Sequence, residues 1–174
     1  MASQQDVVRE LFVTGLVNAH AVEKQALSIM TPQVERIENY PEVADRLRLH
    51  IKETEGQIDR LDELLAAFDT SGSVLKDMGL SMSGSMAALT HSVAGDEIVK
   101  NSFANYAFEH FEIAAYKSLL VLAEDGGFAH ATPLLTQSLG EEQGMAQWID
   151  DALPTITRRY ATLYAEGGSG AAKV

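Results

Sequence analysis

Cysteine is absent from this chain of 174 residues. Its absence excludes disulfide bonds, thiolate-bound metals and cysteine nucleophiles. Basic residues are scarce as well, because 13 lysines and arginines are outnumbered by 25 aspartates and glutamates, which leaves a net charge of −12. Arg158 and Arg159 form the only pair of adjacent basic residues. A nucleic-acid-binding surface needs a basic patch, so we expect no nucleic-acid partner.

Long apolar runs are absent too. No segment approaches the ~20 consecutive apolar residues that span a bilayer, and the start, MASQQDVVRE, lacks the apolar region of a secretory signal. We therefore expect no membrane partner and a cytoplasmic location. Apolar residues still make up 46% of the chain, which is enough for a packed core. We expect one domain over residues 1–174, with a core at about 5–165 and a frayed tail at 167–174.

Apolar residues recur at helical spacing along most of the chain, and β-hairpin signals are missing. The pattern predicts four long helices, at about 4–30, 41–68, 96–124 and 132–152. Pro41 and Pro133 suit first helical turns, Asp96 suits an N-cap, and Pro154 is expected to start a short last helix at about 154–164. The Gly-, Ser- and Met-rich segment 69–95 is expected to be a crossover with one or two short helices. This connectivity is typical of an all-α, ferritin-like antiparallel four-helix bundle.

Three of the predicted helices carry an apolar seam that one glutamate interrupts. The interrupting residues are Glu23, Glu112 and Glu142, each within a 4-3-4-3 series. A buried carboxylate without a partner is costly, and we expect no buried lysine or arginine at the matching seam positions. The pattern therefore favours a metal ion as the shared partner. The alternative is hydrogen bonding across the core from Glu112 or Glu142 to Tyr106, Tyr116 or Gln137.

Two further glutamates lie beside these seams. The apolar seam of the second helix consists of Leu47, Ile51, Thr54, Ile58, Leu61 and Leu65. Glu53 lies one residue away from this seam, beside Thr54. Glu109 precedes Glu112 by one helical turn and shares its side of the helix. His50, one turn before Glu53, is either a metal ligand or a residue that orients one. We expect His20 to be a core or orienting histidine and Glu141 to be solvated.

The spacing of the glutamates supports a shared site. Glu23 and Glu53 are separated by 30 residues, and so are Glu112 and Glu142. Two helix pairs with equal offsets would present their carboxylates at similar heights in a bundle. Iron and manganese accept carboxylate oxygens, with imidazole as a common additional ligand, so a carboxylate-bridged pair of such ions is the expected cofactor.

Four segments carry a resemblance to a known family. They are HAVEKQALSIM (20–30), LHIKETEGQIDRLDEL (49–64), FEHFEIAAYKSLLVLA (108–123) and LLTQSLGEEQ (134–143). Together they resemble the YciE/YciF family of bacterial stress-associated ferritin-like proteins over roughly 7–163. The resemblance implies a ferritin-like fold, a homodimer and a di-iron or di-manganese site with two ions per chain.

The resemblance also assigns ligand positions. Glu23, Glu53, Glu112 and Glu142 match the ferritin-like ligands, and Glu109 matches the extra carboxylate of rubrerythrin-like sites. The chain departs from the usual Glu-x-x-His motif, because Gly56 and Met145 follow Glu53 and Glu142 by three residues and the histidines instead precede glutamates.

We therefore expect a metal-binding protein of bacterial stress response that reacts with peroxide or O2. The rival hypothesis is a non-catalytic structural or interaction protein, a helical dimer whose metal site is vestigial or static. Iron storage in a shell is a third hypothesis, for which the sequence offers no cage-forming feature.

Overall fold

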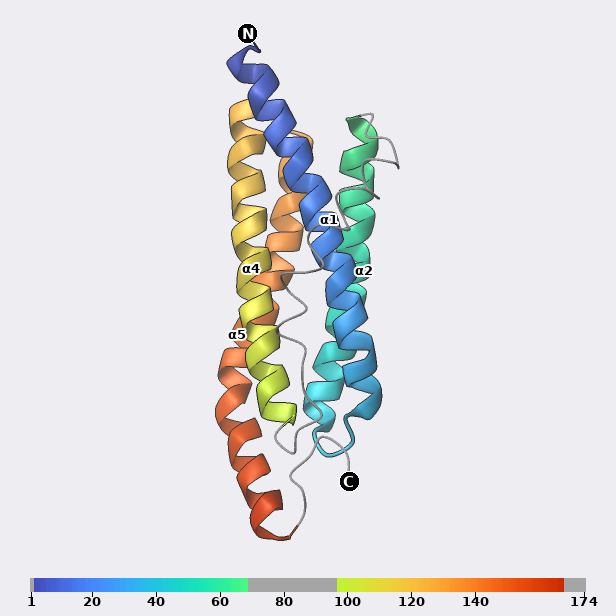
Figure 1. The fold of residues 1–174 in the computed structure, drawn as a ribbon, viewed down its shortest axis with the longest axis vertical. Coiled ribbons are helices and arrows are strands. Elements are labelled where there is room, and N and C mark those ends of the chain that lie inside the picture. Colours follow the sequence, from blue (N-terminus) through green and yellow to red (C-terminus); the bar gives the residue numbers. More distant parts are fainter. Residues whose placement is uncertain (1, 69–96, 168–174) are drawn as a thin grey trace.

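The computed structural model describes residues 2–68 and 97–167 (Figure 1). These residues form α1 (Gln4–Arg36), α2 (Pro41–Ala67), α4 (Glu97–Gly126) and α5 (Ala131–Ala165). Helix α1 packs against α2 and α4, and α5 packs against the same two helices. Figure 1 shows α1 and α5 running in one direction and α2 and α4 in the other, so every neighbouring pair is antiparallel. The predicted all-α, ferritin-like four-helix bundle is confirmed.

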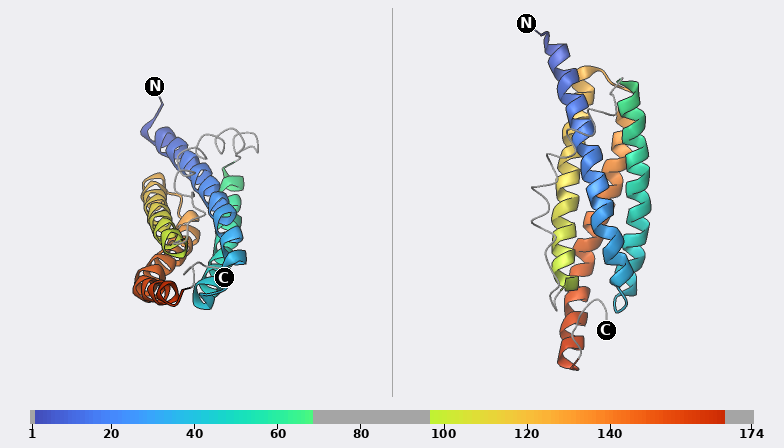
Figure 2. Two further views of the ribbon diagram at one scale, coloured as in Figure 1. Left: turned by 60° about the horizontal axis from the view of Figure 1, so that its bottom comes forward. Right: turned by 45° about the vertical axis from the view of Figure 1, so that its right-hand side comes forward.

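The two hairpins lie side by side, with α1 and α2 on one side and α4 and α5 on the other (Figure 2). Helix α2 ends and α4 begins at opposite ends of the bundle (Figure 1), and residues 69–96 lie between these two helices in the sequence. The short helices predicted in that segment, and the predicted cap at Asp96, lie outside the described residues.

Local signals explain where most helices begin and end. Ser3 caps α1, because its hydroxyl accepts the backbone N–H of Asp6 at 3.1 Å while the Asp6 carboxylate accepts the Ser3 N–H at 2.9 Å. Pro41 occupies the first turn of α2, as predicted. Gly127 follows α4 with a φ of 71°, a left-handed conformation that glycine adopts without steric cost.

Two predicted helix boundaries are wrong. Helix α1 continues through Pro32 to Arg36, and α5 runs through Pro154 without a break, so the predicted short last helix belongs to α5. Proline removes one backbone hydrogen bond from a helix, but burial on both sides outweighs that loss. Ile149 and Ile156, which flank Pro154, are both buried in the core. Helix α5 also starts at Ala131, so Pro133 is its third residue.

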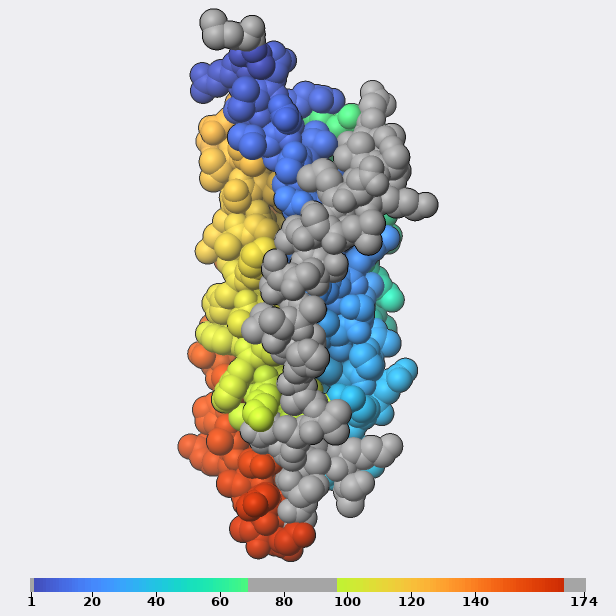
Figure 3. Space-filling view, viewed as in Figure 1, coloured from blue at the N-terminus to red at the C-terminus, as the bar shows by residue number. Residues whose placement is uncertain are grey.

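The apolar core consists of two clusters at different heights. One centres on Phe12, Leu16, Leu61, Leu64, Leu119 and Leu135, and the other on Met30, Tyr40, Leu47, Phe108, Met145 and Ile149. The bundle is elongated, with the start of α1 and the end of α5 at opposite tips (Figure 3). No helix in 4–67 or 97–165 is both long and apolar enough to cross a membrane. The residues between the two clusters occupy the middle of every helix.

Replacing Leu16 with alanine is expected to lower the free energy of unfolding by about 3 kcal/mol, because Leu16 is fully buried and its loss leaves a cavity. Leu11, on the same helix, is 51% exposed, so Leu11→Ala should cost less than about 0.5 kcal/mol. Urea denaturation of both variants measures the difference. Equal losses would contradict this placement of α1.

Candidate metal centre

The inner face of α2 is polar at mid-height. The structure buries Leu47, His50, Thr54, Gln57, Leu61 and Leu64, a 3-4-3-4-3 series. The inner face of α2 therefore differs from the predicted seam. Ile51 and Ile58 are only partly buried, whereas His50 and Gln57 are 1% and 0% exposed. The polar side chains point inward because they meet carboxylates from the opposite hairpin.

His50 lies at the centre of the bundle. Its Nε2 atom is 3.1 Å from Oε2 of Glu109 on α4 and 3.7 Å from Oε2 of Glu142 on α5. One potential ligand atom from each of these three residues lies within 4.8 Å of the other two. Glu109, predicted at the edge of its seam, is 3% exposed and belongs to the centre.

Glu53 lies on the other side of the His50 ring. Its Oε2 atom is 2.8 Å from Nδ1 of His50 and accepts a hydrogen bond from Nη1 of Arg46 at 2.9 Å. The Glu53 side chain is 23% exposed. The structure thus places Glu53 outside the group formed by His50, Glu109 and Glu142, and its ligand role stays a prediction. Arg46, whose side chain is only 12% exposed, is a partly buried cation that the sequence analysis did not anticipate.

Glu23 and Glu112 complete the buried carboxylates, at 1% and 2% exposure. The hydroxyl of Tyr116 donates to Oε1 of Glu23 at 2.7 Å. Two buried carboxylate oxygens, Glu23 Oε2 and Glu112 Oε1, have no hydrogen-bond partner, whereas Glu109 Oε2 and Glu142 Oε2 lie 3.1 and 3.7 Å from Nε2 of His50. Unpartnered buried acceptors are rare in folded proteins, so these oxygens point to a missing cation or proton.

The surroundings of Glu23, Glu112 and Glu142 raise the pKa of each of these carboxyl groups. Burial, and then the charges of Glu23, Glu142 and Glu109, raise the pKa of Glu112 well above its ordinary value. Burial and the neighbouring Glu109 raise the pKa of Glu142 to about 10. Burial also raises the pKa of Glu23 to about 7, although the hydrogen bond from Tyr116 and the charge of His50 act in the opposite direction.

His50 favours its charged form. Burial acts to lower its pKa, but the adjacent carboxylates of Glu109 and Glu53 outweigh burial and raise the pKa of His50 to about 10. The same contact with His50, followed by Arg46, lowers the pKa of Glu53 below its ordinary value. In the protein without metal, the imidazolium is therefore the cation at the centre, and each further carboxylate there must hold a proton or repel its neighbours.

A hydrogen-bond network outside the centre orients Glu142. Gln57 Nε2 donates to Glu142 Oε1 and, at 3.1 Å, to Glu141 Oε2. Arg60 donates to Glu141 and to the Ser138 hydroxyl. Glu141 is therefore partly buried and paired, and the prediction that it is simply solvated is wrong. Sequence reasoning missed Gln57 because the seam was drawn through Ile58, although the spacing from His50 through Thr54 to Gln57 was a usable signal.

The other predicted alternatives are resolved in part. Tyr116 reaches a buried glutamate, but that residue is Glu23, and Gln137 bonds to Glu141. His20 is 7% exposed, and its Nε2 atom lies 3.0 Å from Oδ1 of Asp62, at the rim of the bundle. His20 is thus a core histidine with a surface partner, as expected.

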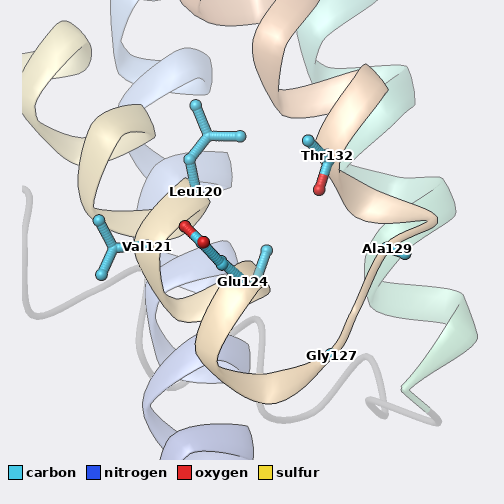
Figure 4. Close-up of a pocket in the computed structure, with 7 residues that line it drawn as sticks. Leu120, Val121, Glu124, Gly127, Ala129 and Thr132 are labelled. Atoms are coloured by element: carbon cyan, nitrogen blue, oxygen red, sulfur yellow. The ribbon is translucent and has the colours of Figure 1, made fainter.

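A pocket of about 450 Å³ lies at the turn between α4 and α5, where Leu120 and Glu124 lie across from Thr132 (Figure 4). None of its lining residues belongs to the carboxylate group. This pocket therefore adds no residue to the candidate metal centre.

Comparison with known proteins identifies relatives along most of the chain. A family model described as "Domain of unknown function (DUF892)" matches residues 7–162. Protein YciF of Escherichia coli (strain K12) is 27% identical over 143 residues, which cover 78% of this chain and 84% of that protein. The predicted resemblance to the YciE/YciF family is confirmed by these matches.

Solved structures support the fold. A protein from Xanthomonas campestris pv. campestris superposes with a TM-score of 0.76 at 28% identity, covering 91% of this chain and 99% of that one. The E. coli stress protein YciF gives a TM-score of 0.67 at 22% identity, over 84% and 94% of the two chains. At that identity the second match shows the fold alone.

Glu23→Gln is expected to change how stability depends on pH in protein stripped of metal by a chelator. A raised pKa in the folded state means that the Glu23 contribution is fully present below about pH 4.5 and is lost as pH rises through 7. The glutamine keeps an oxygen that accepts from Tyr116 but carries no charge. The variant should match the unaltered protein at pH 4 and exceed its free energy of unfolding by roughly 3 kcal/mol at pH 8.5. Urea denaturation at both pH values checks this, and a pH-independent difference would contradict the assignment.

Proposed function

The chain belongs to the DUF892 family, and from its buried carboxylates we propose that it binds two iron or manganese ions at the centre of the bundle. The ligands would come from Glu23, Glu109, Glu112, Glu142 and His50. One observation carries the proposal: two buried carboxylate oxygens without hydrogen-bond partners, Glu23 Oε2 and Glu112 Oε1, belong to a group of four buried glutamates from three helices in which Glu109 and Glu142 share only His50 as a cation.

The donor set fits such ions in charge, chemistry and spacing. Four carboxylates balance the charge of two divalent cations, and carboxylate oxygen with imidazole nitrogen is a set that iron and manganese accept. Metal–ligand bonds are about 2.1 Å long, so the ligand atoms of one ion must lie within a few ångströms of one another. The ligand atoms of His50, Glu109 and Glu142 lie within 4.8 Å of one another, with Nε2 of His50 at 3.1 and 3.7 Å from the two carboxylates, so these three residues would hold one ion. Glu23 and Glu112 supply free oxygens for the second.

His50 would bind a metal ion, and Glu53 would orient the His50 ring. Nε2 of His50 faces Glu109 and Glu142 and is the atom available to a metal, whereas Nδ1 faces Glu53 at 2.8 Å. A histidine ligand commonly donates its other ring N–H to a carboxylate, which fixes the ring and its tautomer. We assign this orienting role to Glu53, which Arg46 holds in place. Metal binding must then displace the Nε2 proton of His50 and the protons of the buried glutamates.

Bound ions would supply open coordination positions at which peroxide or O2 is polarised and reduced. The protein's own residues exclude bulk water, because His50, Glu109, Glu112 and Glu142 are at most 3% exposed. The hydroxyl of Tyr116 donates a hydrogen bond to Oε1 of Glu23. Burial raises the pKa of Tyr116 far above its ordinary value. This tyrosine would be a donor of a hydrogen atom beside the ligands.

The description of one relative supports a proposed cellular role. The E. coli protein YciF is described as a stress protein, so we propose a role in bacterial stress response, in the cytoplasm. The alternative is a static metal site in a structural or interaction protein, in which the ions only neutralise the core. Peroxide consumption and Fe(II) oxidation by the loaded protein separate the two, because a static site binds metal without turnover.

Purified protein incubated anaerobically with Fe(II) or Mn(II), then desalted, is expected to retain close to two ions per chain by elemental analysis. Glu112→Ala should lose at least half of them, because it removes an oxygen at the charge centre. Glu124, on the same helix, is exposed, so Glu124→Ala should retain the full amount. Less than about 0.2 ion per unaltered chain, where a tight site would be nearly full, would refute the metal proposal.

We also propose that the chain forms a homodimer through the outer face of α4. Phe103, Phe111 and Val121 lie on that face at 55%, 42% and 57% exposure. Large apolar side chains gathered on one helix face mark an interaction site, and helices that are apolar all round are usually buried.

Phe111→Asp is therefore expected to convert the dimer to a monomer, with sedimentation equilibrium as the measurement. Leu49→Asp is the matched control, because Leu49 on α2 is 52% exposed and lies away from α4. It should leave the dimer intact. A monomeric unaltered protein would contradict the proposal.

A further inference from the structure

The carboxylate centre is closed to solvent. His50, Glu109, Glu112 and Glu142 are at most 3% exposed, and apolar clusters lie above and below them. An ion that reaches these side chains must therefore pass between two helices. If the proposed metal site is right, the fold must contain a place where this passage is easiest.

A small pocket between α1 and α4 reaches the centre. It encloses about 10 Å³ and is lined by Ala26, Ile29, Met30, Asn105, Phe108 and Glu109. Glu109 is a member of the carboxylate group, and its Oε2 atom lies 3.1 Å from Nε2 of His50. A volume of this size is about that of one water probe. The smallest side chain in its lining is Ala26, so a larger side chain at this position would fill the pocket.

Polar atoms mark the outer end of this pocket. Asn105 stands one turn before Glu109 on α4, and its Nδ2 donates to Oε1 of Gln33 on α1 at 3.1 Å. Both amides are 8% exposed, so they lie between solvent and the interior. Amide and carboxylate oxygens are ligands that hard divalent cations accept in place of water. An ion entering here would meet amide oxygen first and then Glu109.

The backbone of α1 is also weakened beside this pocket. Pro32 lies inside α1, between Met30 and Gln33, and it has no N–H to donate to the carbonyl of Ser28. The turn of α1 between Ser28 and Pro32 is therefore held by one backbone hydrogen bond fewer than a regular helix turn. Local opening is easier where such a bond is missing, so this turn is the part of α1 that opens most easily beside the pocket.

The rival route lies between α4 and α5. A pocket of about 350 Å³ there is lined by Tyr106, His110, Lys117 and Asp150, among others, but by no member of the carboxylate group. Its lining also includes Ile113 and Ala146, which are only 8% and 4% exposed. These apolar side chains form a floor between the pocket and the interior. The larger pocket between α4 and α5 therefore ends at apolar side chains, which a hydrated ion crosses only at a high cost in free energy.

From these contacts we propose that divalent cations enter and leave the centre between α1 and α4, past Ala26, with Asn105 and Gln33 as outer transient ligands. The proposal rests on the proposed metal site and adds the path by which that site is filled. A path differs from a binding contact in one measurable way. Narrowing a path slows entry and release by the same factor and leaves the dissociation constant unchanged, because it alters only the barrier.

The test compares two alanines that line the competing pockets. Ala26 and Ala146 are 5% and 4% exposed, and each is replaced by leucine. Cobalt(II), whose visible absorption changes on coordination, is mixed with metal-free protein in a stopped-flow instrument, and release is followed with excess chelator. Ala26→Leu should slow both rate constants by about tenfold or more with unchanged stoichiometry, whereas Ala146→Leu should leave both within about twofold.

A second variant guards against misfolding of Ala26→Leu. Asn105→Leu removes the outer amide and should slow uptake severalfold while the final cobalt content stays the same. Circular dichroism checks that each variant is folded. Unchanged rates in Ala26→Leu and Asn105→Leu, or slow uptake in Ala146→Leu alone, would overturn the route while leaving the metal site standing. Absence of cobalt binding by the unaltered protein would instead refute the proposed function, and the route with it.

Discussion

Mutual repulsion among buried carboxylates is the constraint on which the rest of this structure depends. Glu23, Glu109, Glu112 and Glu142 are held in one water-poor space, where like charges interact far more strongly than in solvent. The bundle tolerates them only if protons or cations neutralise them. His50 supplies one internal cation, and its raised pKa reflects how strongly the surrounding carboxylates favour it.

This constraint explains features that would otherwise look unrelated. Polar residues replace apolar ones along the inner face of α2 at His50, Thr54 and Gln57 because they face the charged centre. Arg46 and Arg60 stand outside it, where they fix Glu53 and Glu141 without occupying the space of an incoming ion. The apolar clusters on either side hold the four helices in register. The buried carboxylates therefore destabilise the folded protein locally, and the apolar clusters on either side offset that cost, as expected for a site arranged to bind a cation.

The sequence predicted the fold well because helical periodicity and turn residues act locally. It failed at Pro32 and Pro154, where tertiary burial keeps a helix intact across a proline. Glu23, Glu112 and Glu142 were predictable because each interrupts an apolar seam, whereas Glu109 was expected only beside a seam, one turn before Glu112. The orientation of α2 was not, because Ile51 and Ile58 fit a seam as well as His50 and Gln57 do. Only contacts with the opposite hairpin decide between the two faces.

The central claim is that cations, not protons alone, neutralise the interior. Crystals grown with manganese(II) and measured at wavelengths on either side of the manganese absorption edge test it most directly. The account predicts anomalous density in the middle of the bundle, bounded by His50 Nε2, Glu109 and Glu142, with a second peak beside Glu23 and Glu112. Manganese found only on the acidic surface, with the interior carboxylates hydrogen-bonded to one another through protons, would contradict it.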